Sequence, residues 1–215
     1  MRKSIKNNEG KIILENLIKT IQKNKDYLSE IDTLLGDGDH GINMNKGFSL
    51  CYERIKNQEV TLSLGFEILG NVLLSEIGGS MGPLYGMLFL GMSSSVNGKE
   101  EINKYDFSKM IHKAIDEISS ITEAKVGDKT LLDTLMPAIN AFDKEIDSKN
   151  FYDLLNDLIE ASGKGMNSTK NMIAKFGRGS RLGEASKGHL DVGAVSCHFV
   201  LQSIANTMKH LLLNS

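Results

Sequence analysis

The scarcity of helix-breaking and strand-favouring residues most constrains how this chain can fold. Leucine occurs 26 times and isoleucine 20 times, whereas valine occurs 7 times and aromatic residues make up 6% of the chain. Valine and aromatic residues favour strands, and proline interrupts helices. The two prolines, Pro83 and Pro137, leave long stretches with nothing to break a helix. We therefore expect an all-α protein.

Apolar residues recur at intervals of three and four along most of the chain, which is the pattern of an amphipathic helix. Eight segments show it: 12–21, 48–55, 62–77, 84–96, 106–118, 131–136, 151–159 and 192–212. We expect the sixth helix to be kinked or shortened near Pro137, and the polar, glycine-bearing stretch 32–45 to be a loop. A length of 215 residues suits one domain, 1–215, whose short connections make sequential helices antiparallel neighbours.

Glycines and acidic residues gather in alternate connections between the expected helices. These connections are 32–45, 78–83, 122–130 and, less regularly, 177–193. In an up-and-down bundle, alternate connections lie at the same end. The other connections carry Lys, Glu, Ser and Asn without repeated chemistry. We therefore expect the functional site at one end of the bundle.

Charge, cysteine content and hydropathy exclude several classes of protein. A formal net charge of −2 with both signs interspersed argues against a nucleic-acid-binding surface. Cys51 and Cys197 are too few for a disulfide framework or a cysteine zinc site. No apolar run reaches the ~18–20 residues of a membrane span, and residues 1–10 do not lead into the apolar stretch of a signal peptide. We expect a cytoplasmic protein whose partners are small molecules or proteins, with no nucleic acid or membrane among them.

Three carboxylates lie close together in the first of the glycine-rich connections, namely Asp32, Asp37 and Asp39. The stretch 36–41 also matches the dinucleotide pattern G-x-G-x-x-G, but no strand precedes it, and its carboxylates would repel a phosphate unless a cation stood between them. An EF-hand loop is excluded because its required glycine and glutamate positions hold other residues. Carboxylate oxygens in this pattern suit Mg²⁺ bound together with substrate phosphates. The alternative is a capped turn with solvated carboxylates.

The second connection offers a complementary site for phosphate. Its sequence 78–82, GGSMG, is followed by Pro83, a residue favoured in the first turn of a helix. Backbone N–H groups at a helix N-terminus can bind an anion, although the same residues also suit a plain helix–helix turn. Arg178, between two glycines, suits bidentate contact with phosphate. Lys129 could act likewise, or it could be a solvated lysine beside a capping aspartate.

Four motifs follow one another along the chain: GDGDHGINMN (36–45), GG with GPLYG (78–86), GDKT (127–130) and GRGS with LGE and GH (177–189). Together they resemble the nucleotide-binding L subunit of dihydroxyacetone kinases, over essentially the whole chain. The resemblance implies an eight-helix, up-and-down antiparallel barrel. One end of this barrel is implied to bind ADP or ATP through two Mg²⁺ ions.

The resemblance also implies roles for individual residues. Asp32, Asp37 and Asp39 match the carboxylates that hold the metal ions, and no catalytic side chain is expected. The implied nucleotide-binding residues form the turn after these carboxylates, the phosphate loop, the flanks of the base and the closing loops: His40, Gly41, Ile42, Asn43, Ser80, Met81, Thr122, Leu131, Arg178, Asp191, Val192 and Gly193. The family usually has a hydroxyl residue in place of Met81 and a proline in place of Val192. We therefore expect Ser80 to supply the hydroxyl contact and the last loop to be less rigid.

In the bacterial systems that this resemblance implies, the L subunit keeps its nucleotide as a coenzyme. A phosphohistidine protein of the phosphoenolpyruvate phosphotransferase system rephosphorylates ADP, and the phosphoryl group passes to dihydroxyacetone on a separate kinase subunit. A chain of this length lacks the substrate-binding half of the fused ATP-dependent kinases, so we expect a phosphotransferase subunit. Two alternatives stay open: an ATP-dependent kinase subunit for another small ketose, and a nucleotide-loaded regulatory module. The oligomeric state, a homodimer included, stays open as well.

Overall fold

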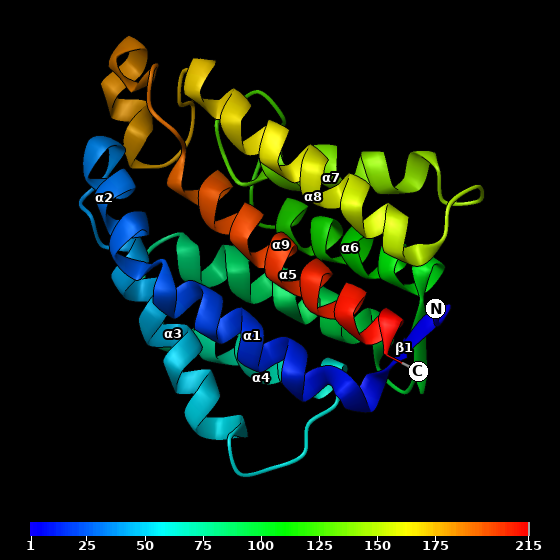
Figure 1. The fold of residues 1–215 in the computed structure, drawn as a ribbon. Coiled ribbons are helices and arrows are strands. Elements are labelled where there is room, and N and C mark those ends of the chain that lie inside the picture. Colours follow the sequence, from blue (N-terminus) through cyan, green and yellow to red (C-terminus); the bar gives the residue numbers. More distant parts are fainter. Residues whose placement is uncertain (215) are drawn as a thin grey trace.

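The computed structural model describes residues 1–214 and is built almost entirely from helices (Figure 1). The α-helices of this part of the chain are α1 (Gly10–Lys23), α2 (Lys25–Leu35), α3 (His40–Ile55), α4 (Leu62–Glu76), α5 (Met81–Val96), α6 (Lys104–Ser119), α7 (Leu132–Lys144), α8 (Phe151–Ser168) and α9 (Val192–Leu213). Three short 3₁₀ helices accompany them: η1 (Asn7–Glu9), η2 (Thr169–Asn171) and η3 (Arg178–Ser186). The prediction of an all-α fold is confirmed.

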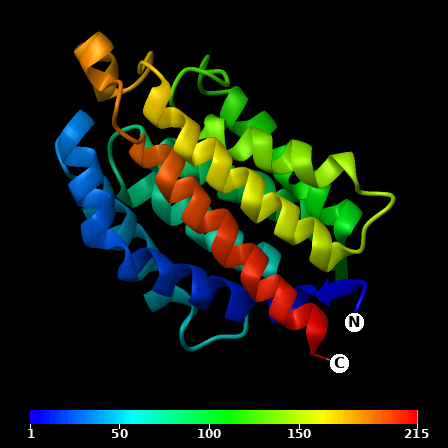
Figure 2. The same ribbon diagram turned by 45° about the horizontal axis from the view of Figure 1, so that its top comes forward.

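Eight of these helices form a closed ring around the hydrophobic core. Neighbours around the ring are α1, α3, α4, α5, α6, α7, α8 and α9, and α9 packs back against α1. Successive members of the ring run in opposite directions (Figure 1), as predicted for an up-and-down barrel. The remaining helix, α2, extends α1 and contacts η3, and the two project beyond one end of the ring (Figure 2).

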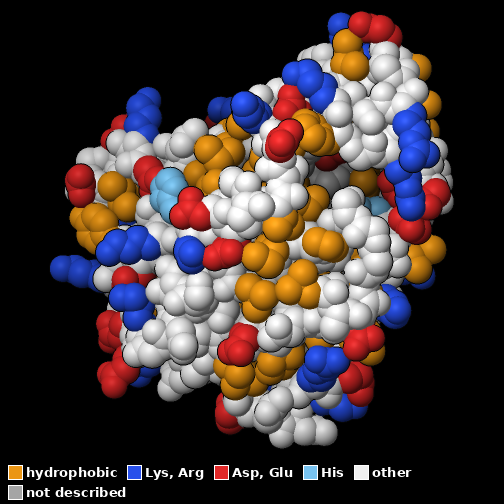
Figure 3. All heavy atoms as spheres, turned by 180° about the vertical axis from the view of Figure 1, so that it is seen from behind, with side chains coloured by type: hydrophobic (Ala, Val, Ile, Leu, Met, Phe, Trp, Pro, Cys, Tyr) orange, Lys and Arg blue, Asp and Glu red, His pale blue; other side chains and the backbone are white. Residues whose placement is uncertain are grey.

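The core contains the apolar residues that set the helical periodicity. In α1, for example, Ile13, Leu14, Leu17 and Ile21 have no exposed surface. Glycines allow the ring helices to approach closely, because a side chain on Gly86 of α5 would meet Leu74 of α4. The face seen from behind in Figure 3 carries apolar side chains along its middle and charged side chains mainly towards its margins. No helix within residues 1–214 is both long and apolar enough to cross a bilayer.

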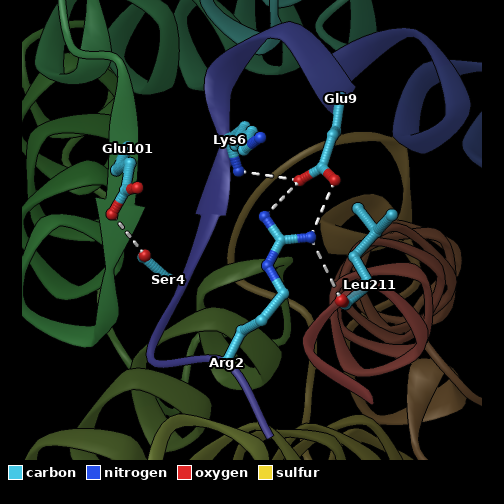
Figure 4. A network of polar contacts seen from close by, with 6 residues as sticks. All are labelled: Arg2, Ser4, Lys6, Glu9, Glu101 and Leu211. Atoms are coloured by element: carbon cyan, nitrogen blue, oxygen red, sulfur yellow. Dashed lines mark hydrogen bonds and ion pairs between the residues drawn. The ribbon is translucent and has the colours of Figure 1, made fainter. Parts of the chain in front are cut away.

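A two-stranded sheet and Arg2 tie the N-terminal segment to the middle of the chain and to its last helix. Strand β1 (Ser4–Lys6) pairs antiparallel with β2 (Glu101–Asn103). Arg2 donates hydrogen bonds to both carboxylate oxygens of Glu9, at 2.7 and 2.8 Å, and one at 3.3 Å to the carbonyl oxygen of Leu211 in α9 (Figure 4). Figure 1 places β1 and the end of α9 far from α2 and η3.

Two expected boundaries are wrong. The stretch 32–45 is not one loop, because α2 continues to Leu35 and α3 begins at His40. Gly41 does not break α3: a side chain there would lie 2.0 Å from the carbonyl oxygen of Lys25, so this glycine lets α3 pack closely on α2. The first predicted helix, 12–21, lies within α1, but α2, which follows after Asn24, was not predicted.

The sixth helix is not shortened at Pro137, since α7 continues to Lys144. Proline removes the amide that would bond to the carbonyl four residues earlier, which here belongs to Asp133. That carbonyl lies against Gly165 of α8, where an added side chain would come within 2.2 Å of it. The close packing of α7 on α8 therefore accompanies the proline inside the helix.

Candidate functional site

A cavity of about 450 Å³ opens at the end of the ring that carries α2 and η3. All four glycine-rich connections contribute to its lining, which includes Asp32 and Asp39, Gly78–Met81, Thr122, Leu131, Arg178 and Asp191–Gly193. The prediction that the site lies at one end of the barrel therefore agrees with the geometry. Residues as far apart in the sequence as Asp32 and Gly193 meet here.

The carboxylates of Asp32, Asp37 and Asp39 converge at one edge of this cavity, each with an oxygen within 4.8 Å of the others. Asp32 lies in the last turn of α2 and is 8% exposed, and its Oδ2 accepts a hydrogen bond of 3.2 Å from the backbone N–H of His40. Asp37 and Asp39 lie in the four-residue link to α3, which turns at Gly38 with φ +78°. Three clustered oxygen ligands of this kind suit a divalent cation such as Mg²⁺.

Arg178 of η3 reaches across to the same carboxylates. Its Nη1 contacts Oδ1 of Asp37 and lies 3.5 Å from Oδ1 of Asp39. About half of each of these three side chains is exposed. A guanidinium at this position partly neutralises the acidic cluster and is close enough to contact an anion bound beside it.

The first turn of α3 places its residues in different environments. The His40 ring nitrogen Nε2 lies 2.9 Å from Oγ of Ser196 in α9, and burial lowers the pKa of His40 to about 4, so the ring is neutral near pH 7. Asn43 lines the cavity, as His40 does. Gly41 is buried against α2, whereas Ile42 is 54% exposed and lies outside the cavity lining.

The N-terminus of α5 opens onto the cavity through Gly78, Gly79, Ser80 and Met81. Gly79 has φ +73°, a conformation that glycine adopts without strain. Ser80 occupies the N-cap position, and its side chain makes no capping hydrogen bond. Met81 is the first residue of α5 and is 8% exposed, packed against the core. The backbone amides of this turn provide the positive end of a helix beside the carboxylates.

The opposite wall of the cavity is largely apolar. It is lined by Ile118 near the end of α6, by Thr122, Ala124 and Leu131 of the α6–α7 connection, and by Phe176. Leu131 is 4% exposed and Phe176 is 38% exposed. A cavity with carboxylates and helix amides on one side and apolar side chains on the other can hold a ligand with a charged part and a flat apolar part.

Asp191, Val192 and Gly193 form the start of α9 at the base of the cavity. Asp191 is the N-cap residue, and its Oδ2 accepts a hydrogen bond of 2.7 Å from the backbone N–H of Ala194. Burial raises the pKa of Asp191 to about 7, and the negative charges of Asp133 and Asp32 act in the same direction. Its carboxyl group therefore takes up a proton far more readily than an exposed aspartate.

Lys129 takes neither of the two roles expected for it. It is 1% exposed, and its Nζ donates hydrogen bonds to the backbone carbonyl oxygens of Met172, Ser186 and His189, at 3.2, 2.7 and 2.7 Å. All three ammonium protons are thus directed at backbone oxygens, so Lys129 is neither a solvated lysine nor free to bind a phosphate. The exposed lysine next to Asp128 is Lys175, at 2.7 Å.

The sequence analysis assigned no role to Tyr85 and Ser196, whose hydrogen bonds connect the helices that carry the site. The Tyr85 hydroxyl lies 2.6 Å from Oγ of Ser196, and it donates a hydrogen bond of 3.1 Å to the carbonyl oxygen of Gly193. With His40, these side chains link α3, α5 and α9 under the cavity. Tyr85 lies within the GPLYG motif, so that motif carried a signal, whereas nothing in the sequence singled out Ser196.

Comparison with known proteins identifies the family. The model of the DAK2 domain matches residues 34–206. The PEP-dependent dihydroxyacetone kinase 1, ADP-binding subunit DhaL, of Listeria innocua is 36% identical over 90% of this chain and 93% of its own length. The PTS-dependent dihydroxyacetone kinase, ADP-binding subunit DhaL, of Lactococcus lactis is 38% identical over 86% of this chain and 88% of its own length.

A solved structure shares the fold. The dihydroxyacetone kinase of C. freundii in complex with AMP-PNP and Mg²⁺ has a TM-score of 0.68 at 20% identity, covering 96% of this chain and 35% of that chain. The ring of antiparallel helices thus has a counterpart in a solved structure, and this chain belongs to the DAK2 domain family.

Proposed function

We propose that this protein is the ADP-binding phosphotransferase subunit of a phosphoenolpyruvate-dependent dihydroxyacetone kinase. The observation that carries the proposal is the single cavity that joins three clustered carboxylates, a glycine-rich helix N-terminus and an apolar wall. These parts fit the metal, the phosphates and the base of a nucleotide. Relatives that match this chain over most of their own length are named ADP-binding subunits of such kinases.

The carboxylates of Asp32, Asp37 and Asp39 would hold Mg²⁺, and we propose two ions there, as the family resemblance implies. Bound Mg²⁺ neutralises negative charge on phosphate oxygens. The amides of Ser80 and Met81 would bind the phosphates at the N-terminus of α5. Ser80 is placed to add a hydroxyl donor that Met81 lacks.

The remaining site residues orient the nucleotide. Thr122 and Leu131 would contact the base, and Arg178 would bind the transferring phosphoryl group while it stays close to Asp37 and Asp39. Phosphoryl transfer depends mainly on positioning and on stabilisation of charge, so these groups suffice without a protein nucleophile.

We propose that ADP stays bound as a coenzyme during turnover. A phosphohistidine protein of the phosphotransferase system would rephosphorylate it, and dihydroxyacetone on a separate subunit would accept the phosphoryl group. The coverage supports this division, because the chain matches about nine tenths of the DhaL relatives but one third of the longer C. freundii kinase.

Reconstitution tests the proposal. The purified chain is combined with a dihydroxyacetone-binding subunit and the phosphotransferase proteins, and dihydroxyacetone phosphate is measured with phosphoenolpyruvate or ATP as donor. We expect product with phosphoenolpyruvate and ADP in the supernatant of the denatured protein. Turnover with ATP alone would favour an exchanging kinase, and bound nucleotide without turnover from either donor would favour a regulatory module.

A further inference from the structure

Lys129 forms hydrogen bonds to both ends of a loop that lines part of the cavity. This loop, residues 172–189, leaves η2, carries η3 with Arg178, and returns towards α9. Met172, one acceptor of the Lys129 ammonium, lies where the loop begins, and the other two, Ser186 and His189, lie where it ends. The ammonium group thus joins the two ends of the loop to the α6–α7 connection. It acts beside two other hydrogen bonds, from the backbone N–H of Ala174 to Oγ of Ser186 and from the backbone N–H of Lys175 to the carbonyl oxygen of Asp128.

The loop has little apolar anchorage of its own. Among residues 172–189, only Ala174 and Ser186 are buried. Three of its glycines, Gly177, Gly183 and Gly188, have positive φ and open space where a side chain would point. Glycine adopts many conformations, so the shape of such a loop depends on its polar ties rather than on packing.

The backbone at Lys129 gives independent evidence that its side chain is required. Lys129 has φ +62°, and within residues 1–214 it is the one residue other than glycine with positive φ. Glycine would adopt this conformation at lower cost. The turn around it is fixed by Asp133, whose carboxylate accepts hydrogen bonds from the backbone N–H groups of Gly127 and Thr130, at 2.5 and 2.7 Å. A strained position that holds a buried lysine indicates that the ammonium itself has a task.

We propose that Lys129 is a positioning residue. Its ammonium group holds the two ends of loop 172–189 together, an arrangement we call the clasp, and so keeps Arg178 over the carboxylates and Asp191 at the base of the cavity. Its effect on nucleotide binding rests on the proposed function, whereas its effect on the loop does not. The barrel core lies outside this loop, so loss of the clasp loosens the loop and leaves the ring of helices folded.

The test uses Lys129→Gly, which suits the positive φ and leaves a space shaped like the lost side chain. Hydrogen exchange of residues 172–189, thermal unfolding and calorimetric titration of MgADP are measured with and without n-butylammonium, which reproduces the lysine side chain. The matched control is Lys187→Met, which removes an exposed lysine from the same loop. An uncharged counterpart, 1-butanol, controls for filling of the space.

We expect exchange in loop 172–189 to rise about 10-fold and MgADP affinity to fall about 10-fold in Lys129→Gly, a change that corresponds to about 1.4 kcal/mol. We expect n-butylammonium to restore both and 1-butanol to restore neither. Lys187→Met should stay within about twofold of wild type, because within residues 1–214 the exposed Lys187 side chain forms no ion pair or hydrogen bond that holds the loop. Helix content and exchange in the ring helices should not change.

Four results would overturn the clasp. The first two are that the loop of Lys129→Gly exchanges at the wild-type rate, or that Lys129→Gly binds MgADP with wild-type affinity when the wild type is shown to bind it. The other two are that 1-butanol restores the variant, or that both Lys129→Gly and Lys129→Met unfold throughout. The last would make the residue a determinant of overall stability. If the wild type binds no MgADP but the loop of Lys129→Gly still loosens and n-butylammonium tightens it, the clasp is supported and the proposed function fails.

Discussion

Replacement of Asp37 by asparagine separates metal binding from turn formation. About half of the Asp37 side chain is exposed, and its recorded partner is Arg178. Exposed ion pairs contribute ~0–1 kcal/mol, and asparagine forms turns about as well as aspartate. Asp37→Asn should therefore fold with nearly unchanged stability in the absence of ligand. It should also lose much of the stabilisation by MgADP, because a neutral amide binds Mg²⁺ less well than a carboxylate.

The size of the effect follows from the length of the chain. A ligand present at a hundredfold excess over its Kd stabilises the native state by about 2.7 kcal/mol. For a chain of 215 residues, the entropy of unfolding near the midpoint is about 0.45 kcal/mol/K, at ~2.1 cal/mol/K per residue. The wild-type Tm should thus rise by about 6 °C with saturating MgADP. At the same ligand concentration, a tenfold weaker variant would keep about half of this rise.

The assay is thermal unfolding followed by circular dichroism, with MgADP, with ADP and a chelator, and without ligand. Asp157→Asn is the matched control, because Asp157 of α8 forms a comparable ion pair of 2.8 Å with Lys149 and lies outside the cavity lining. We expect Asp157→Asn to keep the full rise. If Asp37→Asn folds and keeps the full Mg²⁺-dependent rise, Asp37 is not a metal ligand.

Three further predictions test the surroundings of the site. Gly41→Ala should destabilise the protein by ~1–3 kcal/mol in urea unfolding, because its side chain would lie 2.0 Å from the carbonyl oxygen of Lys25; unchanged stability would contradict the close packing of α3 on α2. Ser80→Ala should weaken ADP binding in calorimetry while Met81→Ser keeps or improves it, and equal affinity of Ser80→Ala and wild type would remove Ser80 from the phosphate site. Burial raises the pKa of the Cys51 thiol to about 12, so iodoacetamide should label Cys51 in urea but not in the native protein; rapid native labelling would refute this.

Most of the ring could be predicted from the sequence because apolar periodicity reports which face of a helix is buried. The errors occurred where glycine served packing instead of chain reversal. Gly41 made the start of α3 resemble a loop, yet it lies where another helix approaches, against Lys25 of α2. A single sequence does not distinguish a glycine that breaks a helix from one that permits close contact.

The site was predictable to the extent that its chemistry is local. Asp32, Asp37 and Asp39 lie within eight residues, so their convergence follows from one short link. The surroundings of Lys129 did not follow from the sequence, since its three acceptors are backbone carbonyl groups 43, 57 and 60 residues away. Backbone acceptors have no residue type, and the sequence therefore contains no signal for such an interaction.

The contact between α1 and α9 has a consequence for synthesis on the ribosome. The first and last helices of the ring are adjacent, and Arg2 donates its backbone N–H to the carbonyl oxygen of Leu212 at 2.8 Å. Until α9 leaves the exit tunnel, the nascent chain exposes the apolar surfaces that α9 covers on α1 and α8. Contacts between segments so far apart in sequence form late and favour aggregation of incomplete chains. Emergence of α9, rather than of any earlier helix, is thus the event that permits the ring to close.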